Sequence, residues 1–241
     1  MKRIVLLVVL VSVSVISRAQ NIVFDENAEI RSVTRFTGVE VSGTISLYLS
    51  QGDTEGVAVS AGDASYNKKI KTEVKNGILH ISVDGGMWNG FNWANRKLKA
   101  YVTVTNLDRV EASGATYVNL TGTIKSDQLK IDISGASEIK GDLDVNKLAI
   151  EVSGASVVRL TGKAQSAFIE ASGACMVNGY KLYIDSCKAS SSGASGIRVF
   201  VKDQLIGDAS GGSSIYYKGT PLSTNLNSSA GSNIKNKSGD D

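Results

Sequence analysis

A tripeptide that reads Ser-Gly-Ala, or a close copy of it, recurs along the second half of this 241-residue chain. Successive copies start 18 to 21 residues apart, and the residues between them alternate between apolar and polar side chains. A period of about 20 residues that carries strand-forming residues is typical of a stacked β-solenoid, in which each repeat forms one turn, or rung. The seven copies start at Ser113, Ser134, Ser153, Ser172, Ser192, Ser210 and Ser229.

The alternation predicts which side chains face the interior of the solenoid. Positions at odd distances from each Ser are mostly apolar; before Ser134 these are Ile133, Ile131 and Leu129. Because the period of two continues through the Gly, the interior face stays the same on both sides of it. The Gly is therefore expected at a tight bend that a Cβ would obstruct, followed by a column of small residues. Five places after the Ser stands a column of β-branched residues: Val118, Ile139, Val158, Val177, Ile197, Ile215 and Ile234.

Composition agrees with an all-β fold. The chain has 25 Gly, a single Pro and few aromatic residues, which suits strands joined by tight turns. The sequence thus predicts a parallel β-helix-like solenoid of about seven Ser-Gly-Ala rungs over residues 106–241. The polar tail from Ser229 to Asp241 is expected to cover the last rung and to discourage edge-to-edge pairing.

Residues 20–105 are also predicted to be β, but less regular. The tripeptide Ser42-Gly43-Thr44 resembles the later motifs, and Asn76-Gly77 between two apolar strands is a strong hairpin signal. We expect antiparallel pairs in this region, and we expect them to cap one end of the solenoid.

Residues 1–19 have the pattern of a secretory signal peptide. Lys2 and Arg3 precede an apolar run that ends at Ile16, and small residues stand before the predicted cleavage site. The apolar run is shorter than a membrane span, so we expect an exported chain without a transmembrane segment.

Charge argues against one class of partner. The chain carries 26 basic and 23 acidic residues, and the signal peptide contains three of the basic ones, Lys2, Arg3 and Arg18, but no acid. The mature chain is therefore formally neutral. Its composition indicates no binding to nucleic acid or to a membrane surface.

Two cysteines, Cys175 and Cys187, lie twelve residues apart within one repeat. Export permits a disulfide between them. The register instead places Cys175 in the column of small residues and Cys187 in an inward Leu column, where two buried free thiols are expected. A bridge would need close, facing Cβ atoms.

Two outward columns carry charge. Two places before each Ser stands an acidic or short polar residue, so rungs stacked about 4.8 Å apart place like charges side by side, with a repulsion of roughly 1 kcal/mol per pair in water. Arg109, Lys130 and Lys188 stand two residues earlier and can pair with these acids, which gives a salt-laced solvent face. A bound divalent cation is the alternative, because closely spaced carboxylates are hard oxygen ligands. The acidic column comprises Glu40, Glu111, Asp132, Glu151, Glu170 and Asp208, with Ser190 and Asn227 in equivalent positions.

The second outward column, six places after each Ser, is basic or polar, and a solvent face is expected for it too. It comprises Asn119, Lys140, Arg159, Asn178, Arg198 and Lys235.

No pattern in the sequence indicates a catalytic, metal or cofactor site. The single histidine, His80, stands in an apolar strand, where a strand residue with a satisfied ring is expected. The sequence has no Gly-x-Ser-x-Gly elbow, no His/Cys metal spacing and no phosphate-binding loop. The Ser of each Ser-Gly-Ala motif has no base at a fixed spacing, so it does not have the setting of a nucleophile.

One segment is not explained by stacked rungs. Residues 84–95 hold both tryptophans of the chain together with Phe91, among Gly and Asn. Rings in a polar loop can offer a flat contact surface to a sugar or a protein, so Trp88, Phe91 and Trp93 are the candidate binding residues. The alternative is that these rings fold back and fill the junction between the two halves of the chain.

The ordered series of motifs resembles the putative auto-transporter adhesin head GIN domain family, which is common in Bacteroides and related bacteria. The resemblance rests on residues 36–45, 76–81 and 107–115 and on the serial Ser-Gly-Ala copies, and it covers nearly all of the mature chain. It implies a right-handed β-helix-like fold, no retained catalytic residues and a role in cell adhesion. It also implies export to the periplasm or the cell surface of a Gram-negative bacterium.

Two functions from different classes remain open. The first is an exported, non-enzymatic binding or structural protein that holds a surface glycan or protein, as a cell-surface adhesin does. The alternative is a polysaccharide-processing enzyme, a lyase or a hydrolase, because parallel β-helices also carry such enzymes. An enzyme would need a cleft with carboxylates of perturbed pKa, whereas a binding protein needs only a flat or grooved face.

Overall fold

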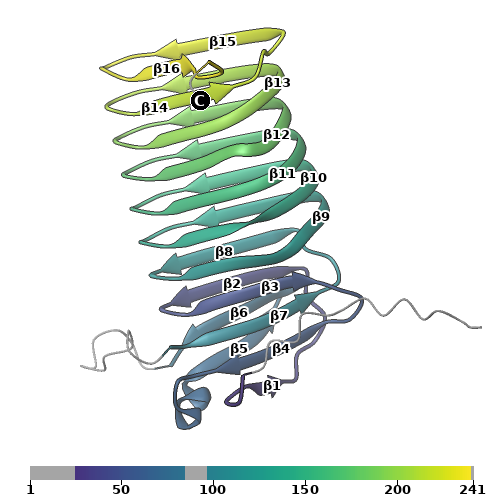
Figure 1. Cartoon of the computed structure of the whole chain (residues 1–241). Helices are drawn as coiled ribbons and strands as arrows, with labels where there is room; N and C mark the ends of the chain where they lie inside the picture. The colour runs from purple at the N-terminus through teal and green to yellow at the C-terminus, as the bar shows by residue number, and fades with distance from the viewer. Residues whose placement is uncertain (1–24, 85–96, 240–241) are drawn as a thin grey trace, which may run out of the picture.

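The computed structural model describes residues 25–84 and 97–239, which form a parallel β-solenoid of about seven turns (Figure 1). The predicted fold class is confirmed, while the predicted signal peptide lies outside the described residues. The N-terminal elements are β1 (Glu29–Arg31), β2 (Gly38–Gly43), β3 (Ser46–Gln51), β4 (Gly56–Ser60), the 3-10 helix η1 (Ala64–Lys69), β5 (Ile70–Lys75), β6 (Ile78–Val83) and β7 (Lys99–Val104). The later strands are β8 (Arg109–Gly114), β9 (Tyr117–Ile133), β10 (Glu138–Val152), β11 (Val157–Ala171), β12 (Met176–Ser191), β13 (Gly196–Ala209), β14 (Ser214–Lys218), β15 (Ser223–Ser228) and β16 (Asn233–Asn236).

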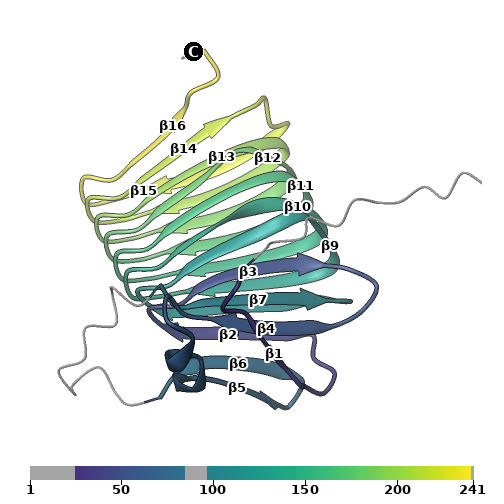
Figure 2. The same ribbon diagram turned by 60° about the horizontal axis from the view of Figure 1, so that its bottom comes forward.

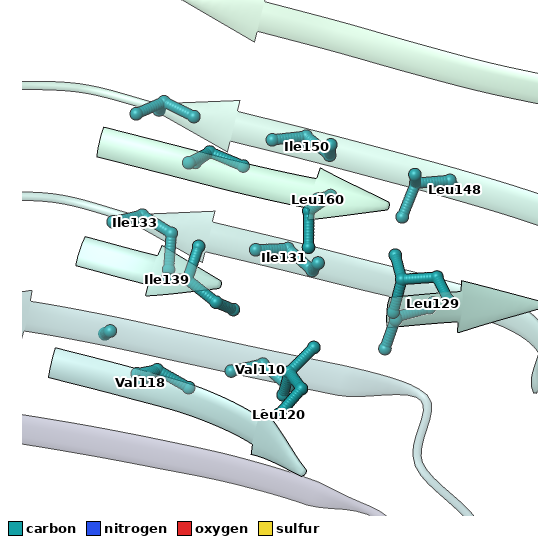
Figure 3. Close-up of a cluster of buried hydrophobic side chains, with 14 of the residues drawn as sticks. Val110, Val118, Leu120, Leu129, Ile131, Ile133, Ile139, Leu148, Ile150 and Leu160 are labelled. Carbon is teal, nitrogen blue, oxygen red and sulfur yellow. The ribbon is translucent and has the colours of Figure 1, made fainter. Parts of the chain in front are cut away.

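Each regular rung is one long strand that bends around the core. β10, for example, pairs in parallel with β9 on one side and with β11 on the other along nearly its whole length. The register aligns the motifs, so that Ile133, Val152 and Ala171 lie side by side in consecutive rungs. In Figure 3, side chains from the two layers of these rungs point toward one another and fill the space between them.

The inward side chains that the alternation predicts are buried. Ile131 and Ile150, in adjacent rungs, are fully buried, and the β-branched column is buried from Val118 to Ile215. The described core is one continuous cluster that reaches from Phe36 to Tyr217. Burial of this apolar surface is the main force that holds the stack of rungs together.

The Ser-Gly-Ala motifs form the corners at which one rung passes into the next. Gly154 has a φ of +78°, in the left-handed region that favours glycine. A Cβ on Gly154 would also overlap the carbonyl oxygen of Gly135 in the preceding rung. That oxygen accepts a hydrogen bond of 2.7 Å from the N–H of Ala155. The corner therefore requires glycine for its backbone angle and for the close approach of successive rungs, which confirms the predicted bend.

A buried column of small residues follows the corner glycines, as predicted. Its hydroxyl groups donate to backbone carbonyl oxygens at the bend. Ser156 Oγ donates to the Gly135 carbonyl at 3.3 Å, and Ser195 Oγ donates to the Ala171 carbonyl at 3.0 Å. Both carbonyl oxygens also accept a backbone N–H hydrogen bond, from Ala155 and from Ser192 respectively. The hydroxyls therefore use the second lone pair of each oxygen, and the corner satisfies the buried hydroxyl groups themselves. The buried members of the column are Thr116, Ser137, Ser156, Cys175, Ser195 and Ser213.

Both cysteines are free and buried, which confirms the expectation of two unpaired thiols. Cys175 takes a Ser position in the column of small residues, and its Sγ lies 3.4 Å from the Gly154 carbonyl oxygen. Burial raises the pKa of the Cys187 thiol to about 12. The protonated thiol is therefore the stable form near neutral pH, and it is a poor nucleophile.

The first rungs are wound out of sequence order. β2 and β3 form a rung that pairs with β8 and β9 on one side and with β6 and β7 on the other. The chain thus completes this rung, leaves it to build the neighbouring β6–β7 rung, and then crosses back to β8. Nothing in the motif spacing predicted this crossing.

Antiparallel strands cap the end of the solenoid that contains β6 and β7, as predicted (Figure 2). β1 pairs with β4 and β4 with β7, while β5 pairs with β6. Asn76 and Gly77 both have positive φ and form the tight turn of the β5–β6 hairpin. Among residues 25–84 and 97–239, no helix is long and apolar enough to span a bilayer.

Asp25 ties the start of the described chain to this cap. Its carboxylate accepts hydrogen bonds from the Tyr101 hydroxyl at 2.8 Å, from Ser60 Oγ at 2.9 Å and from Lys99 Nζ at 3.0 Å. Burial on its own would raise the pKa of Asp25, but these hydrogen bonds outweigh it and lower the pKa to about 2. The ionised carboxylate is thus a fixed part of the cap.

The predicted C-terminal tail, from Ser229 to Asp241, covers part of the last complete rung. That rung consists of β14 and β15, and the tail adds β16, which pairs with β14. All six residues of β15 are exposed. The odd-position pattern places Ile234 in the inward column, and it continues the core instead of lying over it.

The corner geometry makes Gly154→Val a direct test of the register. The branched side chain would meet both the positive φ and the Gly135 carbonyl, so we expect the free energy of unfolding to fall by about 3 kcal/mol or more. Thermal or denaturant unfolding measures this change.

Gly212→Ala is the matched control. Gly212 stands where most motifs have Ala, and a Cβ there would lie 3.6 Å from the Gly193 carbonyl oxygen, an ordinary contact. Its stability should be unchanged or higher by up to about 1 kcal/mol. Equal stability of Gly154→Val and the wild type would contradict the stacked corner.

Candidate functional site

Because the rungs pair in register, residues at equivalent positions of successive repeats lie side by side and form straight outward columns. The acidic column runs along the layer that contains β2 and β8, and the basic column runs along the layer that contains β3 and β14 (Figure 1). The two predicted columns are confirmed, rung by rung. In the acidic column, Glu40, Glu111, Asp132, Glu151, Glu170, Ser190, Asp208 and Asn227 follow one another. In the basic column, Asn119, Lys140, Arg159, Asn178, Arg198, Tyr216 and Lys235 follow one another.

The acidic column is partly neutralised by neighbouring cations. Arg109 lies 2.8 Å from Glu111 on the same strand, and Lys130 lies 2.9 Å from Glu151 diagonally across rungs. Asp132 stands between these two pairs. Burial raises the pKa of its carboxyl, and the nearby charge of Glu151 raises it further. These contacts agree with the salt-laced face expected from the sequence.

Within the described part of the chain, no group of three or more His, Cys, Asp and Glu residues is arranged to hold a metal ion. His80 continues the acidic column beyond Glu40, and its Nδ1 lies 2.9 Å from Glu40 Oε2. The ring thus has a polar partner on a strand surface, as expected for it.

The basic column differs because several of its cations have no carboxylate partner. Arg159 pairs with Glu138. Lys140 instead lies over the ring of Tyr117, 5.2 Å from its centroid. Among the described residues, Arg198 forms no ion pair, and neither does the exposed Lys181, which lies near the column. The fold thus places one mainly acidic and one mainly basic column on different layers.

A groove, which we call groove A, lies beside the basic column where the long strands bend. One wall carries Asn119, Lys140, Arg159 and Asn178, and the other carries Thr123, Asp142, Thr161 and Lys181, around a volume of about 770 Å³. Gly141 also lines the groove, and a Cβ on it would overlap the side chain of Leu120 in the preceding rung.

The second wall of groove A is held in place by hydroxyl groups. Asp142 accepts hydrogen bonds of 2.7 Å from Thr123 Oγ1 and from Thr161 Oγ1, one in the rung before it and one in the rung after it. This fixes the carboxylate along the wall. Sequence reasoning did not single out this wall, whose members stand eight to ten places after the Ser of each motif.

A second groove, groove B, lies beside the acidic column on the other side of the same long strands. Its volume is about 680 Å³. Ala149 forms a hollow between Lys130 and Phe168 in the adjacent rungs, and Lys188 lies 5.8 Å from the centroid of the Phe168 ring. The acidic column and its bound cations border this groove, so its charge is mixed.

The predicted binding residues Trp88, Phe91 and Trp93 lie outside the described residues, in the segment that joins β6 to β7. The sequence therefore still leaves both of their roles open. The structure instead draws attention to grooves A and B, which the outward columns border.

Comparison with known proteins gives one family and a consistent fold. The model of the family described as putative auto-transporter adhesin, head GIN domain, matches residues 35–221. A putative adhesin from Bacteroides fragilis is 23% identical, with a TM-score of 0.78 over 87% of this chain and 95% of that one. A putative adhesin from Parabacteroides merdae is 17% identical, with a TM-score of 0.69 over 87% and 95% of the two chains.

A third structure, a putative lipid binding protein from Parabacteroides distasonis, is 17% identical, with a TM-score of 0.65 over 88% of this chain and 98% of that one. At such identities these likenesses show the fold alone. No curated protein matches the chain.

The raised pKa of Asp132 predicts that its charge destabilises the fold. A carboxyl whose pKa is higher in the folded state binds its proton more tightly there, so the site favours folding as the pH falls through that pKa. Near neutral pH, Asp132→Asn should therefore raise the free energy of unfolding, by less than about 1 kcal/mol for a half-exposed group. The gain should disappear at acidic pH, where both forms are uncharged.

Glu170→Gln is the control, because Glu170 is exposed in the same column and its removal should change stability less. The same melting experiment tests the cation alternative. We expect added calcium to leave the melting temperature unchanged. A rise with calcium that Glu151→Gln abolishes would show that the acidic column is a metal site.

Proposed function

Because this chain belongs to the head GIN domain family of putative auto-transporter adhesins, we propose that it is an exported, non-enzymatic binding protein. It would act in the periplasm or at the cell surface of a Gram-negative bacterium, where it would hold a surface glycan or a protein. A role in adhesion is the form of binding that the family's description names.

The observation that carries this proposal is the continuous register of the outward columns. One hydrophobic core fixes every rung, so side chains on each layer form long arrays whose spacing is set by the backbone. A preformed surface loses little conformational entropy when it binds, which favours affinity for an extended or repetitive partner. The grooves add concave surface beside these arrays.

The enzymatic alternative would use paired carboxylates in a cleft. Among the described residues, Asp132 is the carboxyl with a raised pKa, and its neighbour Glu151 is held by Lys130. Neither Asp132 nor Glu151 lines groove A or groove B. We therefore favour binding over hydrolysis or elimination.

A turnover assay separates these functions. The mature chain would be applied to an array of bacterial and host glycans, and each glycan that it retains would be incubated with it and checked for new reducing or unsaturated ends. We expect saturable binding without depolymerisation. Depolymerisation that Asp132→Asn abolishes would contradict the proposal and identify an enzyme.

The aromatic segment gives a separate prediction. If Trp88 and Trp93 form a contact surface, changing both to Ala should leave the melting temperature nearly unchanged and weaken ligand or cell binding by about 1 kcal/mol or more. If the rings fill a junction, the same change should lower stability by about 3 to 5 kcal/mol per buried ring. A melting curve together with a binding curve distinguishes the two roles, because we expect only one of the two quantities to change.

A further inference from the structure

We propose that groove A binds an acidic polysaccharide, a linear glycan that carries carboxylate or sulfate groups. This inference rests on the proposed binding function and names the class of ligand. It is carried by two features of the described surface: cations without carboxylate partners along one line, and an exposed tyrosine, Tyr183, on the strand that lies between Arg159 and Arg198.

The cations are arranged along the axis of the solenoid. Lys140 and Arg159 lie in adjacent rungs, and Arg198 lies two rungs beyond Arg159. Rungs are spaced at about 4.8 Å, so the column presents positive groups at intervals of one and two rungs. Lys181 adds a further cation from the facing wall. A polymer with regularly spaced anionic groups can meet several of these positions at once, and each contact adds to the affinity.

The acids beside groove A are already engaged. Glu138 is paired with Arg159, and Asp142 accepts hydrogen bonds from two threonine hydroxyls. Asp142 keeps its negative charge, because hydroxyl donors do not neutralise it, but Lys140, Lys181 and Arg198 outnumber this one carboxylate. Asn178, on the same wall, supplies an amide that can hydrogen-bond to sugar hydroxyls. The groove therefore combines charge recognition with donors for neutral parts of a sugar.

The aromatic pair extends groove A along β12. Tyr183 stands two residues after Lys181 on the same outward face, and 58% of its surface is exposed. Its ring packs edge-on against Phe200 in the next rung, with centroids 4.9 Å apart. A ring that is fixed by a neighbour and open to solvent is a suitable platform for the apolar face of a pyranose. Stacking next to a line of cations favours an acidic sugar over a neutral one.

The test uses the mature chain with polygalacturonate as the acidic probe and dextran as the neutral one. We expect polygalacturonate to bind, with an affinity that falls as salt is added, and dextran not to bind. Lys140→Ala combined with Lys181→Ala should weaken polygalacturonate binding by about tenfold or more, as expected for the loss of two charge-assisted contacts. The affected side chains lie on the surface, and a melting curve checks that the variants remain folded.

The matched control removes the same charge from groove B. Lys147→Ala combined with Lys188→Ala should change the affinity by less than about twofold. Tyr183→Ala should weaken binding, and Tyr183→Phe should restore it, because the ring without its hydroxyl still stacks. Equal losses from the groove A and groove B variants would show attraction by net charge alone and would overturn the proposal.

Two further outcomes would overturn the choice of ligand. Dextran binding as tight as polygalacturonate binding would mean that the negative charge is not recognised. Single-stranded DNA that displaces polygalacturonate at equal concentration of charge and salt would point to a general polyanion surface. If the protein instead binds a neutral glycan or a protein unaffected by the groove A variants, this inference fails while the proposed function stands. If it binds no glycan and no cell surface, both fail.

Discussion

The close approach of backbones at the Ser-Gly-Ala corners is the constraint on which the rest of the structure depends. From Gly114 to Gly193, each corner glycine has its missing Cβ directed at the carbonyl oxygen of the corner glycine one rung earlier. That oxygen accepts a hydrogen bond from the N–H of the Ala that follows the later glycine. Gly43 begins this column, although it lies in the less regular N-terminal region. Because the corners of successive rungs lie directly over one another, each rung can pair with its neighbour in only one register. The inward residues of successive rungs therefore line up in columns.

The same constraint explains what the sequence predicted well. A period of two on each side of a fixed corner determines which residues face inward, so Ile131, Ile150 and the β-branched column could be assigned without a structure. It also determines the order of the outward columns, and Asp132 beside Glu151 or Lys140 beside Arg159 follows from counting alone. The buried Ser column and the free thiols follow in the same way, because position in the repeat sets burial.

What could not be predicted depends on contacts that the period does not encode. The crossing of the chain over the β2–β3 rung is set by pairing between strands far apart in sequence, and no motif marks it. The tail covers the last complete rung as a paired strand, β16 on β14, and its polar composition did not predict this pairing. Groove A arises where strands bend, and its second wall depends on the bulges near Asp142 and Thr161, which shift the register locally.

Separation of the inward and outward residues has a consequence for function. The corners and inward columns alone are needed to stack the rungs, so outward residues are free to differ while the fold is retained. Structures that share only 17 to 23% identity with this chain retain TM-scores of 0.65 to 0.78, as this division predicts. Ligand preference must therefore be argued from the outward residues of each chain. In this chain, the acidic column is partly neutralised by ion pairs, whereas Lys140 and Arg198 in the basic column have no carboxylate partner, so an acidic partner gains most at the basic column.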